Sequence, residues 1–229
     1  MSEATAEVEA RRHLLVDFGG VISRPQPAGT LQRLALLAGA TQSDFIGRYW
    51  EHRDAFDRGL SAAEYWERVV GRAVGAAEVE QLSRADVESW THLNPATITV
   101  LAASRAAGDQ LTLLSNAPHT QADVLTVDPT MQVLFDRMIF SARIGLSKPD
   151  PRIYSFALSQ IPTTAKPVFI DDRRENVIAA RRSGIPGIVF HSAEQLDDEL
   201  ARQRRVSEPD YRSGNLPLYG FHFDSRRRQ

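Results

Sequence analysis

Short apolar runs alternate with helical patterns along this chain, and this alternation most constrains its fold. The runs His13 to Phe18 and Leu111 to Leu114 have the length of a buried strand and stop at polar or turn-forming residues. Similar runs lie at 137–140, 167–170 and 187–190. Strands that alternate with helices form a parallel sheet with helices on both faces. The sequence therefore predicts an α/β fold, a Rossmann-like doubly wound parallel sheet.

A long helical segment interrupts this alternation after the first strand. Residues 24–92 contain three or four helical patterns and no convincing strand. Within them, Ser61 to Glu64 reads as a capping box, and Gly59 is suited to end the preceding helix. We expect 24–92 to form a helical cap domain inserted into an α/β core domain made of residues 13–23 and 93–203.

The composition is that of a soluble globular protein, with 42% hydrophobic and 24% charged residues among 229. The absence of cysteine excludes disulfides, zinc–thiolate sites and cysteine nucleophiles. A net charge of −2 gives no basic field for nucleic acid, and no run approaches the ~18 apolar residues of a membrane helix.

The two ends of the chain differ in character from the predicted domains. Residues 1–9 are polar and lack the apolar stretch of a signal peptide, so we expect a cytoplasmic enzyme. Residues 204–229 are predicted to be a C-terminal tail, either disordered or an arm that packs on a partner. A homodimer is one oligomeric state open to such a chain.

Polar residues at the ends of three predicted strands carry the candidate chemistry. Asp17 is followed by Gly19 and Gly20, whose backbone can approach an anion or a metal closely. Ser115-Asn116 could hold a phosphate oxygen, although the pair is also ordinary turn chemistry. Asp171-Asp172 repel each other, and Mg²⁺ would relieve that repulsion. Alternatively, Asp172 caps the next helix.

Lys148 precedes a helix predicted to start at Asp150-Pro151, and it is one of only two lysines among 27 basic residues. The helix dipole slightly disfavours a lysine there, which an anionic group nearby would explain; otherwise it is a solvated loop residue. Ligands of parallel sheets bind beyond the carboxyl ends of the strands. We therefore expect these segments to form one site for phosphoryl transfer with a divalent metal.

In this order, the segments resemble the four motifs of the haloacid dehalogenase-like hydrolase superfamily, over residues 13 to 203. The helical insert resembles the first cap class of that superfamily. Phe56 to Ser61 resembles caps of a sugar-phosphatase-like branch, in which the second aspartate of the first motif can be absent. The matching stretches are Asp17 to Val21, Leu113 to Asn116, Ser147 to Tyr154 and Phe169 to Val177.

The resemblance implies a role for each candidate residue. Asp17 would attack the phosphorus of a small phosphorylated metabolite and form an aspartyl-phosphate, while Lys148 stabilises the negative charge. The phosphate would be held by Ser115, the backbone of Asn116 and Gly20. Mg²⁺ would be bound by Asp17, the backbone carbonyl of Gly19 and Asp172, with Asp171 as a ligand directly or through water.

Glycine at position 19 departs from the motif, because most phosphatases of that superfamily carry an acid/base aspartate there. General acid–base catalysis is worth ~10²–10⁴-fold in rate. Water, His119 or His52 could carry the proton instead, and Arg48 or Arg53 could read the substrate. The alternatives are a non-catalytic module that binds a phosphorylated ligand or a protein, and a haloacid dehalogenase.

Overall fold

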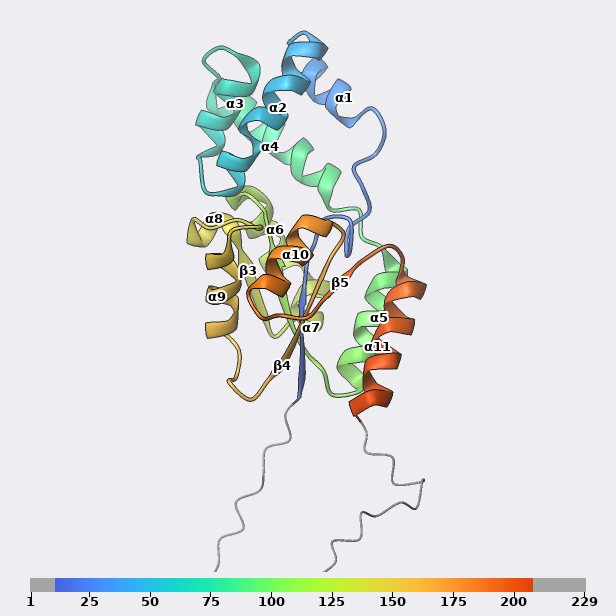
Figure 1. Ribbon diagram of the computed structural model, residues 1–229. Coiled ribbons are helices and arrows are strands. Elements are labelled where there is room, and N and C mark those ends of the chain that lie inside the picture. Colours follow the sequence, from blue (N-terminus) through green and yellow to red (C-terminus); the bar gives the residue numbers. More distant parts are fainter. Residues whose placement is uncertain (1–10, 208–229) are drawn as a thin grey trace, which may run out of the picture.

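The computed structural model describes residues 11–207, with a five-stranded parallel sheet at the centre of the core (Figure 1). The strand order is β3-β2-β1-β4-β5, so β1 pairs with both β2 and β4. The predicted doubly wound parallel sheet is therefore confirmed. The strands are β1 (Arg12–Val16), β2 (Gln110–Ser115), β3 (Arg137–Phe140), β4 (Lys166–Asp171) and β5 (Gly187–Val189).

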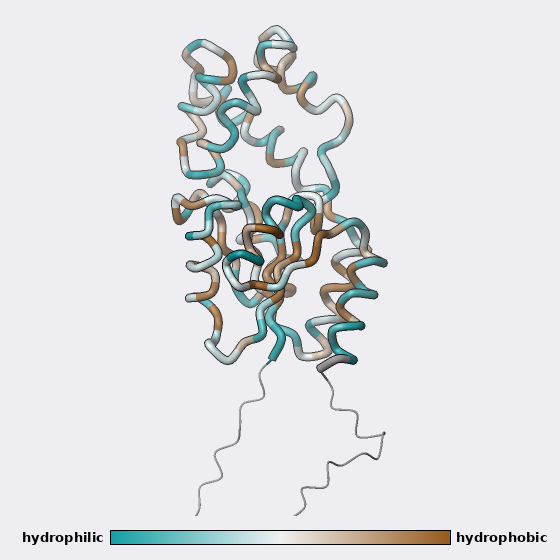
Figure 2. The backbone as a smooth tube through the Cα atoms, in the orientation of Figure 1, coloured by the Kyte–Doolittle hydropathy of each residue, from teal (hydrophilic) through white to brown (hydrophobic). Residues whose placement is uncertain are grey.

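Helices cover both faces of the sheet, because successive side chains of a strand point to opposite faces. Leu14 and Val16 of β1 pack in the cluster that includes α5, α6, α7 and α11, whereas Leu15 packs with α9 and α10. Apolar residues follow the strands through the middle of the core, and polar residues alternate along the outer helices (Figure 2). The helices of the core are α5 (Pro95–Ala106), α6 (His119–Val127), α7 (Pro129–Leu134), α8 (Ser141–Ile144), α9 (Pro151–Ser159), α10 (Arg174–Arg182) and α11 (Ala193–Ser207).

The structure adds helices that the sequence did not predict, between β2 and β3 and directly after β3. Helix α6 begins after Pro118 and has no side-chain cap, so its start lacks the usual signal. Helix α11 continues to Ser207, so residues 204–207 of the predicted tail are helical. The remainder of that tail lies outside the described residues.

Four helices follow β1 and form a separate cluster above the carboxyl ends of the strands (Figure 1). Their core is aromatic: Phe56 stacks on Tyr65 with ring centroids 4.0 Å apart, and buried Trp66 donates to Ser83 Oγ at 2.8 Å. The predicted capping box is present at Ser61 and Glu64. The helices of this cap are α1 (Thr30–Leu37), α2 (Gln42–Asp57), α3 (Ala62–Val70) and α4 (Ala76–Trp90).

Two antiparallel segments join the cap to the core. Ser23 pairs with Leu93 in an isolated bridge, the Arg24 N–H donates to the His92 carbonyl at 2.7 Å, and the Asn94 N–H donates to the carbonyl of residue 22 at 2.7 Å. The insertion therefore begins and ends at neighbouring points of the core.

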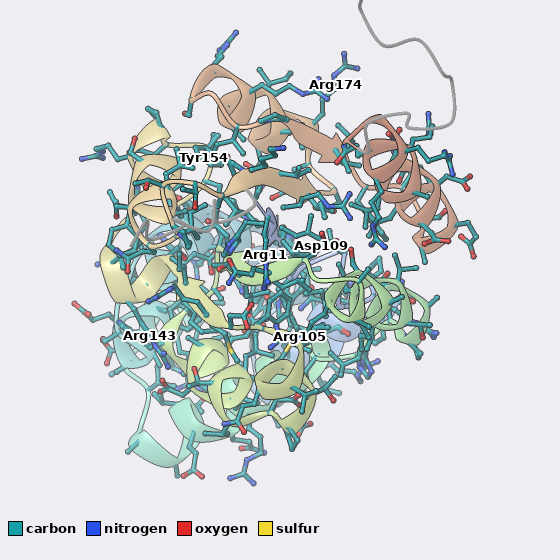
Figure 3. All side chains as sticks on the ribbon, turned by 90° about the horizontal axis from the view of Figure 1, so that it is seen from below. Arg11, Arg105, Asp109, Arg143, Tyr154 and Arg174 are labelled. Atoms are coloured by element: carbon teal, nitrogen blue, oxygen red, sulfur yellow. The ribbon has the colours of Figure 1, made fainter. Side chains whose placement is uncertain are left out.

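The opposite end of the sheet carries a cluster of charged residues that pair with one another (Figure 3). Asp109 accepts from Arg12 Nε at 3.0 Å and from Arg204 Nη2 at 3.2 Å, and Arg105 pairs with Asp136 at 2.8 Å. The first two contacts tie β1 and α11 to the segment between α5 and β2, and the third ties α5 to the segment before β3. Within residues 11–207, no helix is both long and apolar enough to cross a membrane.

Candidate active site

The carboxyl ends of β1, β2 and β4 and the loop before α9 bring the predicted residues to one cavity of about 580 Å³ between core and cap. Asp171 is the exception, because it is fully buried beneath the cavity and does not line it. The cavity floor includes Asp17, Gly19, Gly20, Ser115, Asn116, Lys148 and Asp172.

Lys148 is the central charge of this floor, with 3% of its surface exposed. Its Nζ lies 2.7 Å from Asp17 Oδ1, 2.8 Å from Asp171 Oδ2 and 2.9 Å from the Leu114 carbonyl oxygen. An ammonium has three hydrogens to donate, so these three acceptors fully satisfy it. The prediction that Lys148 lies beside anionic groups is confirmed. The alternative, that Lys148 is a solvated loop residue, is wrong.

Asn116 holds the Lys148 backbone in place. Its Oδ1 accepts from the Lys148 N–H at 2.8 Å, and its Nδ2 donates to the Lys148 carbonyl at 2.9 Å. The Asn116 amide is thereby occupied, which leaves its backbone as the group available to a ligand. The neighbouring Ser115 hydroxyl faces the cavity and makes no hydrogen bond within the described part of the chain.

Asp171 acts mainly as an anchor for its neighbours. Its Oδ1 accepts from the Arg173 N–H at 2.8 Å and from Asn176 Nδ2 at 3.0 Å, and its Oδ2 accepts from Lys148 and again from Asn176. Asn176 was not among the candidate site residues predicted from the sequence. Its position five residues after Asp171, on the first turn of α10, could have indicated that it contacts the site. The alternative prediction, that Asp172 caps the next helix, is wrong, because the N-cap residue of α10 is Arg173.

Gly19 and Gly20 have different surroundings. Gly20 has a φ of +71°, and a Cβ there would overlap the Asp172 carboxylate, so only glycine lets Asp172 lie against this loop. A Cβ at Gly19 would meet no heavy atom within 4 Å. The missing side chain at position 19 is therefore not imposed by lack of space.

The floor carries more negative than positive charge. Asp17, Asp171 and Asp172 have carboxylate oxygens that all lie within 4.8 Å of one another, and Lys148 is the single ammonium among them. Burial raises the pKa of Asp17, while Lys148 opposes this shift and Asp171 adds to it. Burial and then Asp171 also raise the pKa of Asp172. A hard divalent cation fits such a donor set, because oxygen ligands and local negative charge are what it prefers.

The cap supplies the opposite wall through α2 and α4, and Arg53 is its buried cation, 8% exposed. Arg53 Nε donates to Asp57 Oδ1 at 2.9 Å, and Nη1 lies 2.8 Å from Tyr49 Oη and 3.3 Å from Asp86 Oδ2. The same Tyr49 hydroxyl donates to Asp86 Oδ1 at 2.6 Å. The cap residues that line the cavity include Trp50, Arg53, Asp54, Asp57 and Trp90.

The histidines considered as proton carriers do not line this cavity. Neither His52 nor His119 is among the described residues around it, and the His119 ring lies against Gly59 instead. Arg48 also lies elsewhere and donates to the Val70 carbonyl at 3.4 Å. Of the cap residues that the sequence offered for substrate contact, Arg53 is the one that reaches the cavity.

Comparisons with known proteins agree with this architecture. A family model for haloacid dehalogenase-like hydrolases matches residues 12–184. A HAD family enzyme from Bacteroides thetaiotaomicron, solved in complex with magnesium and inorganic phosphate, is similar with a TM-score of 0.63 and 18% identity. The likeness covers 82% of this chain and 99% of that chain, and at this identity it concerns the fold.

Two curated relatives match different shares of the chain. The drimenol cyclase drtB of Aspergillus calidoustus is 26% identical over 195 residues, which are 82% of this chain and 36% of that protein. The sesquiterpene phosphatase astK of Aspergillus oryzae is 46% identical over 69 residues, which are 30% of this chain and 32% of that protein. The match therefore spans little more than a third of the length of drtB, and the match to astK is a local one that covers about a third of each protein.

Proposed function

The chain belongs to the haloacid dehalogenase-like hydrolase family, and on that premise we propose that it is a Mg²⁺-dependent phosphatase that acts on a small phosphomonoester. The observation that carries the proposal is the contact of Asp17 Oδ1 with Lys148 Nζ at 2.7 Å on the floor of the cavity. A carboxylate held by a fully satisfied ammonium is a nucleophile with a fixed direction of attack.

The nucleophilic attack and the binding of the phosphate each have groups on the floor to support them. Asp17 forms a bond to phosphorus as the bond to the leaving oxygen breaks, which gives an aspartyl-phosphate that water then hydrolyses. Lys148 offsets the charge of the nucleophile and the transferred group. The free Ser115 hydroxyl and the backbone N–H groups of Asn116 and Gly20 would hold phosphate oxygens.

Mg²⁺ would be held by Asp17, Asp172 and the Gly19 carbonyl, with Asp171 acting beneath them through its contacts with Lys148 and Asn176. The bound ion supplies charge neutralisation of the phosphoryl oxygens. The acidic donor set and the placement of Asp172 against Gly20 support this assignment.

The cavity and Gly19 support a substrate class within this proposal. A volume of about 580 Å³ suits a small metabolite. Without a carboxylate at position 19, a good leaving group such as that of a sugar 1-phosphate needs less protonation. The resemblance of Phe56 to Ser61 to caps of the sugar-phosphatase-like branch supports the same class.

The proposal is tested by phosphate release from a broad phosphomonoester panel that includes sugar 1-phosphates, with Mg²⁺ and with chelator. We expect Mg²⁺-dependent turnover that falls at least ~10³-fold in Asp17→Asn, because the nucleophile is lost. Asp123→Asn, on the exposed face of α6, is the matched control. Binding of inorganic phosphate without turnover by the wild type would instead favour a non-catalytic module, and chloride release from 2-chloropropionate would favour a dehalogenase.

A further inference from the structure

The proposed reaction needs a proton donor for the leaving group, and Gly19 cannot provide one. Among the described residues that line the cavity, the carboxylates not assigned to the nucleophile or the metal are Asp54 and Asp57, both on α2. We propose that Asp57 is the general acid and base of the reaction. This assignment rests on the proposed function.

Asp57 is fastened to the phosphate-binding side of the core. Its backbone carbonyl accepts a hydrogen bond from Ser141 Oγ, and the same Ser141 Oγ accepts from the Ala117 N–H at 2.9 Å. Ala117 directly follows Asn116, so one hydroxyl links the end of α2 to the loop that would hold the phosphate. A cap residue tied to that loop keeps its position over the reacting phosphorus better than one on the far end of the cap.

The Asp57 carboxylate has one oriented oxygen and one open oxygen. Its Oδ1 accepts from Arg53 Nε at 2.9 Å, and its Oδ2 makes no hydrogen bond within the described part of the chain. The side chain is 14% exposed, and it lines the cavity. A general acid needs this combination, in which a neighbour orients the group and one oxygen is left to carry the proton.

Asp54 offers a contrast on the same helix. Its side chain is 63% exposed, its Oδ2 pairs with Arg58 at 2.6 Å, and its Oδ1 accepts from Ser147 Oγ at 3.3 Å. Both of its oxygens are occupied and the group is well solvated. For Asp57, burial raises the pKa of the carboxyl, although Arg53 opposes the shift. The proton is therefore retained more readily on Asp57 than on an ordinary aspartate.

Arg53 fixes the direction of Asp57. The guanidinium is held by Tyr49 Oη and Asp86 Oδ2, and it lies 5.2 Å from the centroid of the Trp90 ring. These contacts come from α2 and α4, so the orientation of Asp57 depends on the packing of the cap and not on solvent. Arg53 is in this sense a positioning residue.

The proton balance follows from this arrangement. As Asp17 bonds to phosphorus, the electron pair of the breaking P–O bond goes to the leaving oxygen, which takes the proton of Asp57 and departs as an alcohol. Asp57, now a carboxylate, then takes a proton from the water that attacks the aspartyl-phosphate. The bond between phosphorus and Asp17 breaks, inorganic phosphate leaves, and Asp57 is protonated again.

The test is the dependence of Asp57→Asn on the leaving group. Asparagine can still accept from Arg53, so the network around it is kept. We expect kcat/KM for alkyl phosphomonoesters to fall ~10²–10⁴-fold, and that for an aryl phosphate with an acidic phenol to fall less than ~10-fold, because such a leaving group needs no proton. Asp54→Asn is the matched control, with no such selectivity expected. Turnover of the aryl ester also reports that the variant is folded.

A second substitution that restores activity tests the assignment of Asp57 further. Position 19 has room for a side chain, so Gly19→Asp in the Asp57→Asn background is expected to restore alkyl ester turnover by at least ~10-fold. A loss in Asp57→Asn that is equal for all leaving groups, or no loss, would overturn the role of Asp57 alone. A wild type that hydrolyses no phosphomonoester would overturn the proposed function together with it.

Discussion

Two buried cations face the cavity from opposite sides, and each holds two carboxylates. Lys148 in the core contacts Asp17 and Asp171, and Arg53 in the cap contacts Asp57 and Asp86. In each group, one carboxylate is buried away from the cavity: Asp171 is 0% and Asp86 is 1% exposed. The other carboxylate of each group lines the cavity. The same arrangement, a buried anchor and a partner that lines the cavity, thus occurs twice.

The two groups are built by different means. The core group joins residues from β1, β4 and the loop before α9, which only the folded sheet brings together. The cap group rests on helical periodicity, because Tyr49, Arg53 and Asp57 are spaced four residues apart on α2, and α4 adds Asp86. The core group therefore depends on the sheet. The cap group depends on two packed helices and lies entirely within the cap.

The largest effect is expected from removing the core cation. Lys148→Met leaves Asp17 and Asp171 facing each other, and the free energy of unfolding should fall by about 3–5 kcal/mol without Mg²⁺, because a buried charge loses its partner. Urea unfolding measures this, with the exposed Lys166→Met as control. Arg53→Met should cost less, because Asp86 keeps the Tyr49 hydroxyl. Equal losses in Lys148→Met and Lys166→Met would contradict the central role of Lys148.

Mg²⁺ should distinguish the two groups. At about 100 times its dissociation constant, the ion is expected to stabilise the wild type by about 2.7 kcal/mol. Asp172→Asn should remove most of this increment, since it removes a proposed ligand, whereas Asp86→Asn in the cap should leave it in place. Thermal unfolding with and without Mg²⁺ gives the increments. If the ion stabilised Asp172→Asn as much as the wild type, the proposed metal site would be wrong.

The Tyr49 hydroxyl lies at the centre of the hydrogen-bond network in the cap. It forms hydrogen bonds with Asp86, Arg53 and Trp90 Nε1. Tyr49→Phe leaves these groups partly unsatisfied and should destabilise the protein by about 1–3 kcal/mol. Tyr65→Phe is the matched change, because its hydroxyl makes one hydrogen bond, to the Tyr49 carbonyl at 3.0 Å, and should cost about 0.5–1.5 kcal/mol. Denaturant unfolding of both variants checks the order.

The smallest effect concerns a buried group outside both clusters. Burial lowers the pKa of His13 below its usual 6.5, and Nε2 lies 2.8 Å from Thr112 Oγ1. The unfolded chain takes up a proton near pH 6.5 while the folded chain resists, so stability is lost as the pH falls below that value. His13→Gln should lose less stability than the wild type between pH 7 and 5, by at most about 1.4 kcal/mol per pH unit. A parallel loss in both proteins would exclude His13 as a contributor.

The core group was predictable from the sequence and the cap group was not. Asp17 and Asp171 end apolar runs, and Lys148 is one of two lysines. The sequence therefore offered few candidates for each of these positions in the site. Arg53 is one of many arginines, and Asp57 lies on a helix with charged residues on several sides. Nothing in the spacing says which face of α2 meets the core. Tertiary contacts such as those of Ser141 with the Asp57 carbonyl and of Ser147 with Asp54 join that face of α2 to the core.

The paired segments at Ser23 and Leu93 make the cap an insertion whose two ends lie side by side. Because the chain leaves the sheet and returns to it at adjacent points, a tight turn could close the gap without disturbing the order of the strands. Lengthening, trimming or replacing the inserted helices would alter one wall of the cavity and leave the other intact. The two walls of the cavity could then change at separate rates over the history of such a chain.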